Sequence, residues 1–288
     1  MTTYGFIGLG HQGSPMAERM IAAGMRPWIW ARRDEVLDRY RDADARIAAS
    51  PAQVGAECDV IGLCMYDADA TDAVLFGDDG LMTSIRSGTV LAIHATVAPN
   101  YVVSLSERVA DRGVRILDAP VSGGDAETAS RGELLVIVGG DDAELDACRP
   151  MIDTYSNRVV RVGPVGAAQA TKLINNVLMT AITGLVFDAY EMGRAFSIDE
   201  EGLADVLAGG SAANPSVSIY RQLGGAETFS VRAWPTLHKD VPLARAELDA
   251  RGVDVPLLLP TAEATIGEMV RLRTPWVEAR QASDGVDR

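Results

Sequence analysis

The segment Gly8-Leu9-Gly10-His11-Gln12-Gly13 has the spacing G-x-G-x-x-G. A short apolar run at residues 4–8 precedes it, and a helical pattern at 15–23 follows. In this context the first glycine makes a tight turn, the second lets the backbone approach a pyrophosphate, and the third lets the helix pack on the strand. The helix N-terminus then offers N–H groups to the anion. We predict that all six residues bind a dinucleotide; a tight strand-to-helix turn without a ligand is the alternative.

The end of the second predicted strand, at residues 28–30, indicates which dinucleotide is preferred. A site for NAD usually carries an acidic residue there, which binds the 2′-hydroxyl of the ribose. The sequence continues instead with Ala31, Arg32 and Arg33, and a guanidinium can bind the 2′-phosphate of NADP. We predict that these residues favour NADP(H) over NAD(H); solvated arginines at a helix start are the alternative. Trp30 is expected to be a packing residue.

A lysine and an asparagine are spaced one helical turn apart in the middle of the chain. Lys172 and Asn176 belong to a helical pattern that runs from Gln169 to Arg194, so their side chains project from one face. Burial disfavours the charge of a lysine and can bring its pKa toward neutral pH, where it exchanges protons. The pair is therefore a candidate for acid–base chemistry, with a solvated surface lysine as the alternative.

The elements that must position these residues change in type near residue 163. Before it, short apolar runs alternate with helical patterns, which predicts parallel strands joined by right-handed crossovers. After it, only helices and turns are expected. The predicted fold is α/β, with an N-terminal Rossmann-type doubly wound sheet over residues 1–163 and an all-α domain over residues 164–288 that begins with the long helix. The later strands are expected at residues 59–65, 89–93, 114–117, 134–138 and 159–162.

Composition excludes several classes of protein. The chain has 26 Lys and Arg against 40 Asp and Glu, a net charge of −14, which argues against binding to nucleic acid or to an anionic membrane surface. No apolar run approaches the ~20 residues that span a bilayer. The three cysteines, Cys58, Cys64 and Cys148, lack metal-ligand spacing and fit a reducing cytosol. The three histidines show no spacing for a metal site either. We expect a cytoplasmic protein without a metal.

Four groups of residues carry a resemblance to a known family. They are Gly5-Phe6-Ile7-Gly8-Leu9-Gly10 with Ser14-Pro15-Met16-Ala17, Asp118-Ala119-Pro120-Val121-Ser122-Gly123-Gly124, the segment from Gly166 to Asn176, and Lys239-Asp240 with Pro256 downstream. In this order they resemble the β-hydroxyacid dehydrogenases, which include 3-hydroxyisobutyrate dehydrogenase, tartronate semialdehyde reductase and glyoxylate/succinic semialdehyde reductases. The resemblance covers nearly the whole chain.

The resemblance implies a function and a set of site residues. The expected activity is the transfer of a hydride between nicotinamide and a small β-hydroxy acid or semialdehyde, with Lys172 as the general acid/base. Asn176 would orient the substrate and the lysine, and a loop with a hydroxyl and N–H groups would bind the substrate carboxylate. That loop consists of Ser122, Gly123 and Gly124, and the further cofactor contacts implied are Met65, Tyr66, Thr96 and Lys239.

Some positions depart from the family pattern. Members often have methionine in place of Gln12, Asp-Ser in place of His94-Ala95, and a phenylalanine in the region around Arg232. Gln12 and His94 could make the surroundings of the nicotinamide more polar, although packing or hydrogen bonding is the expectation for each histidine. Arg232 is expected to be an ordinary surface arginine, with pairing to an anionic substrate as the alternative.

Two other functions stay open at this stage. Imine reductases share the expected fold but typically carry aspartate or tyrosine in place of Lys172. Non-catalytic relatives keep the dinucleotide site but lose the lysine and gain further domains. The helical stretch at 177–190 is too apolar for a solvated helix, which indicates a partner. Together with this stretch, the resemblance implies a homodimer or homotetramer.

Overall fold

The computed structural model describes residues 2–123 and 126–284, with side chains as far as residue 277. The chain forms two compact units, Met1–Lys172 and Leu173–Arg288. The division therefore falls inside helix α8 (Ala167–Ala195), nine residues after the boundary that the change in sequence pattern suggests. The first turns of α8 belong with the sheet because backbone N–H groups of Gly166 and Gln169 donate to Asp118.

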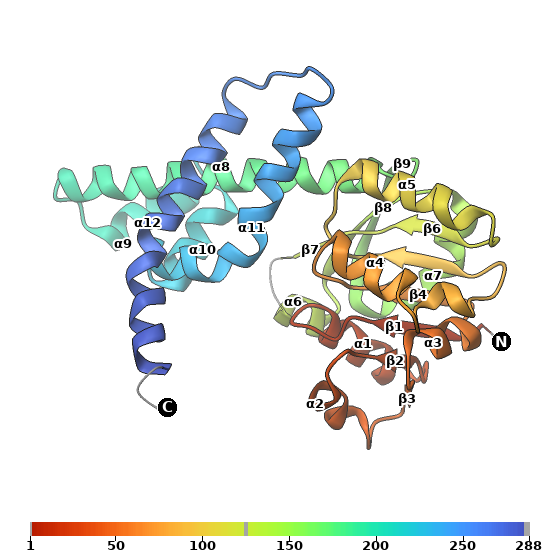
Figure 1. Cartoon of the computed structure of the whole chain (residues 1–288). Helices are drawn as coiled ribbons and strands as arrows, with labels where there is room; N and C mark the ends of the chain where they lie inside the picture. Colours follow the sequence, from red (N-terminus) through yellow and green to blue (C-terminus); the bar gives the residue numbers. More distant parts are fainter. Residues whose placement is uncertain (1, 124–125, 285–288) are drawn as a thin grey trace. The chain divides into compact units, whose positions relative to one another are not determined.

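A nine-stranded sheet forms the centre of the first unit (Figure 1). Six strands are parallel in the order β3-β2-β1-β4-β5-β6, so the strand order reverses next to β1. This is the doubly wound arrangement predicted from the alternating pattern, and ligands bind such sheets at the carboxyl ends of the strands where the order reverses. These strands are β1 (Tyr4–Ile7), β2 (Trp28–Trp30), β3 (Arg46–Ile47), β4 (Val60–Leu63), β5 (Val90–Ile93) and β6 (Arg115–Asp118).

We predicted parallel pairing for the whole sheet, but the other edge of the sheet contains antiparallel pairs. Strand β8 (Leu134–Gly139) runs antiparallel to both β6 and β7 (Val121–Ser122), and β9 (Ser156–Gly163) pairs in parallel with β8. Strands β6 and β7 pair with β8 in one antiparallel register, in which Asp118 faces Gly139 and Ser122 faces Leu135, so β8 runs back along the line that β6 and β7 form. The prediction of parallel pairing was therefore wrong for β8, the strand predicted at residues 134–138.

Each face of the sheet buries its own apolar core because strand side chains alternate between faces. Phe6 packs in the cluster that includes residues of α1 and α7, and Ile7 packs in the cluster that includes residues of α3, α4 and α5. The helices of this unit are α1 (Gly13–Ala22), α2 (Asp34–Leu37), α3 (Pro51–Glu57), α4 (Ala68–Phe76), α5 (Pro99–Ala110), α6 (Ala126–Arg131) and α7 (Asp142–Tyr155).

The second unit contains only helices among its described residues, as predicted. Their starts follow local signals: the side chain of Asp199 accepts from Gly202 N–H to cap α9, and Asn214 caps α10 ahead of Pro215. The helices after α8 are α9 (Glu200–Gly209), α10 (Pro215–Leu223), α11 (Ala226–Asp249) and α12 (Leu258–Asp284). Helices α11 and α12 pack against each other (Figure 1).

Helix α8 is long and apolar enough to cross a membrane by length and composition alone. Half of its most apolar window is buried, however, and the core helix of a soluble protein satisfies the same criteria.

Candidate functional site

The glycine turn after β1 is tight on one side and open on the other. Gly8 has a φ of +101°, and a Cβ there would lie 2.3 Å from the carbonyl oxygen of Cys64. A Cβ on Gly13, the first residue of α1, would lie 2.0 Å from the Gly8 carbonyl oxygen. A Cβ on Gly10 would meet nothing within 4 Å. The space over Gly10 is therefore the place where a pyrophosphate can approach the backbone, and the first turn of α1 contains no acidic residue that would repel it.

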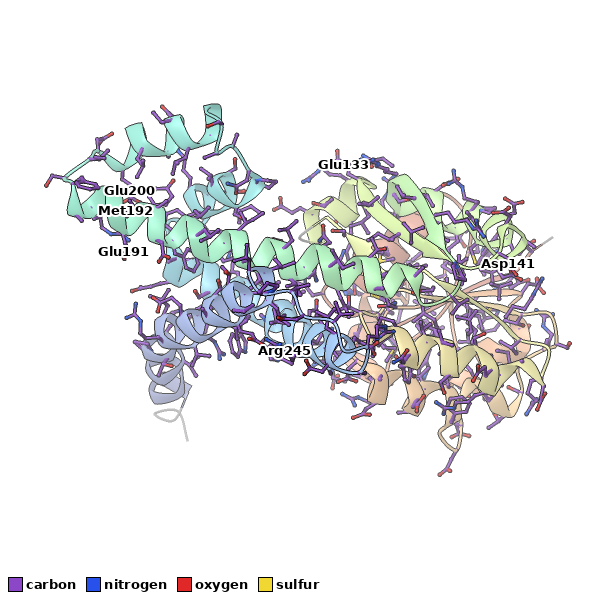
Figure 2. All side chains as sticks on the ribbon, turned by 90° about the horizontal axis from the view of Figure 1, so that it is seen from above. Glu133, Asp141, Glu191, Met192, Glu200 and Arg245 are labelled. Atoms are coloured by element: carbon purple, nitrogen blue, oxygen red, sulfur yellow. The ribbon has the colours of Figure 1, made fainter. Side chains whose placement is uncertain are left out.

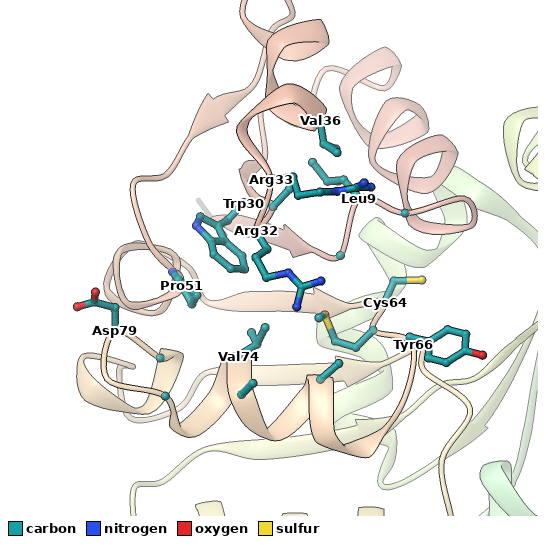
Figure 3. Close-up of a pocket in the computed structure, with 18 of the residues that line it drawn as sticks. Leu9, Trp30, Arg32, Arg33, Val36, Pro51, Cys64, Tyr66, Val74 and Asp79 are labelled. Carbon is teal, nitrogen blue, oxygen red and sulfur yellow. The ribbon is translucent and has the colours of Figure 1, made fainter. Parts of the chain in front are cut away.

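A cavity of about 570 Å³ adjoins this turn (Figure 3). Its size lies within the range of small-molecule sites. Its walls come from the glycine turn, the ends of β2 and β4, the start of α3, and α4 with the segment that follows it. Its lining residues are Gly8, Leu9, Gly10, Trp30, Ala31, Arg32, Arg33, Val36, Pro51, Cys64, Met65, Tyr66, Ala70, Ala73, Val74, Gly77, Asp78, Asp79 and Gly80. These residues fit a dinucleotide, which needs an open glycine for its pyrophosphate and an apolar slot for its adenine.

The two arginines after β2 line this cavity, and both are exposed to solvent. Figure 3 shows the Arg32 side chain between Trp30 and the end of β4, whereas Arg33 lies beside Leu9 and Val36. The acidic residues of the lining, Asp78 and Asp79, belong to the segment after α4, and Asp79 lies on the far side of the cavity from Arg33. The end of β2 thus presents guanidinium groups where an NAD site presents a carboxylate. Trp30, expected to be a packing residue, is part of the cavity wall.

The structure brings many of the predicted cofactor residues together and places others elsewhere. His11 lines a neighbouring cavity of about 600 Å³, which shares Leu9, Gly10, Arg33 and Val36 with the first. Gln12 precedes α1 as its N-cap residue and lines neither cavity, and Gly13 packs against the turn. Thr96 follows β5 in the same unit and is half-buried, and Lys239 belongs to the helical unit.

The segment around Thr96 is held from both sides by one glutamine. The fully buried side chain of Gln169 donates from Nε2 to the carbonyl oxygen of Ala95 at 3.0 Å, and its Oε1 accepts from Val97 N–H at 3.0 Å. Gln169 lies one turn before Lys172 on α8. The side-chain amide of Gln169 therefore holds the backbone on both sides of Thr96 against the first turns of α8, one turn before Lys172.

A buried carboxylate fixes the start of α8. Asp118, the last residue of β6, accepts from the N–H groups of Gly166 and Gln169 at 3.0 and 3.1 Å and from Gln169 Nε2 at 2.8 Å. Burial raises the pKa of Asp118 to about 6, although the hydrogen bonds from Gln169 and Gly166 oppose that shift. Lys172, three residues after Gln169, is itself buried.

Asn176 is held by a second buried carboxylate, in the helical unit. Its Nδ2 donates to Asp240 Oδ2 at 2.5 Å, and its Oδ1 accepts from Asn175 at 3.0 Å. Asp240 is fully buried and also pairs with Lys239, with Nζ 3.0 Å from Oδ1. These bonds fix the orientation of the Asn176 amide one turn after Lys172 on α8.

The predicted carboxylate-binding segment is partly a strand. Ser122 belongs to β7 and pairs with Leu135 of β8, so it is not in a loop as expected. Gly123 has a φ of +152°, and a Cβ there would lie 2.8 Å from Thr128, so the chain turns closely at this point. Gly124 lies outside the described residues. The Ser122 side chain is half-buried at the edge of the sheet.

His94 is a core residue, as its packing interpretation predicted. Its Nδ1 lies 2.7 Å from the carbonyl oxygen of Ala119 and its Nε2 lies 3.0 Å from the hydroxyl of Tyr155, while its ring stacks on Phe6. Burial lowers its pKa to about 4, so the ring is neutral at pH 7. Among the described residues, no group of three or more His, Cys, Asp or Glu side chains could hold a metal ion.

Comparison with known families agrees with this architecture. Residues 3–163 match the model of the NAD binding domain of 6-phosphogluconate dehydrogenase, and residues 166–271 match the NAD-binding domain of NADP-dependent 3-hydroxyisobutyrate dehydrogenase. The chain belongs to the β-hydroxyacid dehydrogenase family. As a member of this family of hydroxyacid oxidoreductases it has the NAD-binding Rossmann domain and the helical second domain that its motifs predicted.

Individual relatives of this chain differ in the substrates that their names give. An L-threonate dehydrogenase of Cupriavidus necator is 34% identical over 204 residues, which cover 70% of this chain and 68% of that protein. A 3-hydroxyisobutyrate dehydrogenase of Pseudomonas aeruginosa is 28% identical over 268 residues, 89% of each chain. Among solved structures, Psf3 in complex with NADP+ and 2-OPP is 25% identical with a TM-score of 0.79, covering 95% of each chain.

Three residues that hold this part of the structure were not predicted as site residues: Gln169, Asp118 and Asp240. Asp118 and Asp240 stand inside the motifs quoted above, and Gln169 was noted only as flanking the face of Lys172. A carboxylate at the carboxyl end of a buried strand was the available signal for Asp118. No local pattern predicts the partners of Gln169 or Asp240, because those bonds join residues 72 and 64 positions apart.

Proposed function

We propose that this protein is an NADP-preferring oxidoreductase of a small β-hydroxy acid or the corresponding semialdehyde, with Lys172 as general acid/base. The observation that carries the proposal is the order of functional groups along α8. Gln169 ties the helix to the segment of Thr96, Lys172 is buried one turn later, and Asn176 follows after another turn with its amide fixed by Asp240. Burying polar groups costs free energy of folding, and buried titratable groups of this kind are concentrated at functional sites.

When bound, the nicotinamide would supply the hydride in reduction or accept it in oxidation. The ammonium of Lys172 donates a proton to the carbonyl oxygen of the substrate in the reductive direction, and the neutral amine removes it in the oxidative direction. Asn176 orients the side chain of Lys172 and the substrate oxygen toward each other. The hydroxyl of Ser122 binds the substrate carboxylate at the edge of the sheet.

The preference for NADP rests on the cavity wall at the end of β2. Arg32 and Arg33 supply two guanidinium groups there, and a guanidinium binds a phosphate through paired hydrogen bonds. The complex of the 25% identical Psf3 with NADP+ supports the same preference. The three cysteines are free thiols, which fits a cytoplasmic enzyme.

A substrate panel combined with Lys172 variants tests the proposal. The panel contains 3-hydroxyisobutyrate, L-threonate, L-serine, the matching semialdehydes and a cyclic imine, each with NADP(H) and NAD(H). We expect turnover of a hydroxy acid or semialdehyde. Lys172→Ala and Lys172→Arg should each lose about 10²–10⁴-fold in kcat, because arginine keeps the charge but does not release its proton. NADPH binding, followed by fluorescence, should be retained in both variants.

Two outcomes contradict the proposal. Full turnover by Lys172→Ala with intact cofactor binding removes the acid/base role. Turnover of the cyclic imine without any hydroxy acid or semialdehyde assigns the chain to imine reduction instead.

A further inference from the structure

The second cavity, of about 600 Å³, adjoins the proposed dinucleotide cavity on the side of α1 and α2. Four residues belong to the walls of both cavities: Leu9, Gly10, Arg33 and Val36. The two cavities therefore meet at the glycine turn and the start of α2. The wall that belongs to the second cavity alone comes from the first turns of α1, from Glu35 and Arg39, and from α6.

Arg39 presents a third guanidinium group to this region. It lies on η1 (Asp38–Tyr40), the 3₁₀ turn that continues α2, three residues after Val36 and therefore on the same face. Its Nη2 donates to the hydroxyl of Ser14 in the first turn of α1. The buried Ser14 hydroxyl in turn donates to the carbonyl oxygen of Leu9 at 2.8 Å. The Arg39 side chain is thus tied to the glycine turn.

The guanidinium of Arg39 keeps donors for a ligand. Many arginines of this acidic chain are bound by a carboxylate: Arg245 of α11, labelled in Figure 2, donates to both oxygens of Glu263 at 2.8 Å. Among the described residues, the carboxylate paired with Arg39 is that of Glu18, and its oxygen lies 4.0 Å away, beyond hydrogen-bond distance. A guanidinium carries five N–H donors, and the Ser14 hydroxyl occupies one of them.

The junction of the two cavities indicates which ligand group Arg39 can reach. With a pyrophosphate over Gly10 and an adenine in the first cavity, the ribose that joins them would lie along the shared wall at Leu9 and Arg33. The 2′-oxygen of that ribose faces the end of the second strand in such sites, so a 2′-phosphate would extend toward α2 and η1. Arg32 lines only the first cavity and Arg39 only the second, so the two guanidinium groups would approach this phosphate from different sides.

Two carboxylates also line the second cavity, and one of them is already engaged. Glu18 accepts a hydrogen bond from the hydroxyl of Tyr40 at 3.3 Å. Glu35 is exposed in the first turn of α2, where its charge would repel a phosphate. Removing the charge of Glu35 should therefore act opposite to removing that of Arg39.

We propose that Arg39 is a further specificity-determining residue of the cofactor site and binds the 2′-phosphate of NADP from the side of the second cavity. It acts together with Arg32 and Arg33 through the paired hydrogen bonds that a guanidinium makes to a phosphate. This role of Arg39 rests on the preference for NADP proposed above.

Two ligands that differ only in the 2′-phosphate isolate the contribution of Arg39. Adenosine 2′,5′-bisphosphate and AMP are titrated by calorimetry into the unchanged chain, which should bind the bisphosphate more tightly. Arg39→Ala should weaken binding of the bisphosphate by about 10-fold and leave the Kd for AMP nearly unchanged. Arg41→Ala is the matched control, because Arg41 is exposed, pairs with Asp38 and lines neither cavity. Thermal unfolding confirms that each variant is folded.

A charge of the opposite sign gives a second test. Glu35→Gln should tighten binding of the bisphosphate by about 2- to 5-fold, the range expected for one exposed charge. Asp38→Asn, an acidic residue three positions later that lines neither cavity, should leave the Kd unchanged. Binding of the bisphosphate that Glu35→Gln leaves unchanged or weakens would mean that the phosphate lies outside the second cavity, which overturns the role of Arg39.

The titrations also separate this role from the preference for NADP itself. If the unchanged chain prefers the bisphosphate while Arg39→Ala weakens both ligands equally, or neither, then Arg39 does not select the cofactor, although the preference for NADP stands. If the unchanged chain binds AMP as tightly as the bisphosphate, the preference for NADP fails, and the role of Arg39 fails with it.

Discussion

Gln169 Nε2 donates to Asp118 Oδ1 at 2.8 Å, and this buried bond joins the first turn of α8 to the end of β6. The same amide brackets Thr96 through Ala95 and Val97. A strand end, a loop and a helix start thus meet at one side chain. If Lys172 is the general acid/base, Gln169 is a positioning residue for it.

Replacing Gln169 should lower both the stability of the fold and the turnover. Gln169→Met keeps the volume but leaves the Val97 N–H and the acceptors of Asp118 and Ala95 without this partner, at about 1–3 kcal/mol for each unsatisfied group. We expect a lower free energy of unfolding in urea, together with a fall in kcat that exceeds the change in the KM for NADPH. Gln53→Met, which loses one exposed hydrogen bond to Ala49, is the control. Unchanged kcat in a folded Gln169→Met would remove the positioning role.

Two glycines of the same turn should respond in opposite ways to one methyl group. Gly10→Ala adds a Cβ in open space, so the melting temperature should hold while the Kd for NADPH rises. Gly13→Ala drives a Cβ against the Gly8 carbonyl and should lose about 1–3 kcal/mol of stability or more. Thermal unfolding and a fluorescence titration measure both effects. Unchanged cofactor affinity in Gly10→Ala would mean that the pyrophosphate does not approach this glycine.

Removing a guanidinium should change the choice of cofactor. A hydrogen bond to a charged group is worth about 1.5–3 kcal/mol, so Arg32→Ala should lower kcat/KM with NADPH by about 10- to 100-fold. With NADH, which lacks the 2′-phosphate, the value should change little. Arg112→Ala, at an exposed arginine elsewhere in the unit, should affect neither cofactor. A strong preference for NADH that Arg32→Ala leaves unchanged would contradict the proposed NADP preference.

His94 should make the stability of the chain depend on pH. Its pKa is about 4 in the folded chain against 6.5 for the free side chain, so between these values the unfolded chain binds a proton that the folded chain does not. This contribution to stability is complete above pH 6.5 and falls by about 3 kcal/mol as the pH drops to 4. Asp118 acts in the opposite direction, because its folded pKa of about 6 lies above the usual 3.8. Its contribution is largest below pH 3.8 and is lost as the pH rises through 6.

His94→Asn isolates the histidine, because asparagine can still donate to the Ala119 carbonyl but does not titrate. Urea unfolding of both proteins at pH 7 and pH 4.5 measures the effect. The unchanged chain should be more stable than the variant at pH 7, and most of that advantage should disappear at pH 4.5. An equal difference at both pH values would show that His94 does not stay neutral in the folded chain.

Local signals were sufficient for the tight glycine turn after β1, the arginines after β2 and the spacing of Lys172 and Asn176. Each depends on a short segment whose geometry its own residues determine, such as the positive φ of Gly8 or the helical turn between the lysine and the asparagine. The antiparallel direction of β8 and the strand conformation of Ser122 were missed, because strand direction depends on which neighbours pair, and a two-residue strand has almost no pattern of its own.

The sequence by itself therefore determined the family, the two fold types and the order of the groups along α8. Only the tertiary structure decided that Trp30 lines a cavity and that His94 is buried and neutral. It also decided that Gln169 and Asp240 hold the elements around Lys172. The physical reason is that burial and long-range hydrogen bonds are properties of the packed chain. No local pattern marks a glutamine whose partner is 72 positions away. Its polar groups leave water only when distant parts of the chain pack around them.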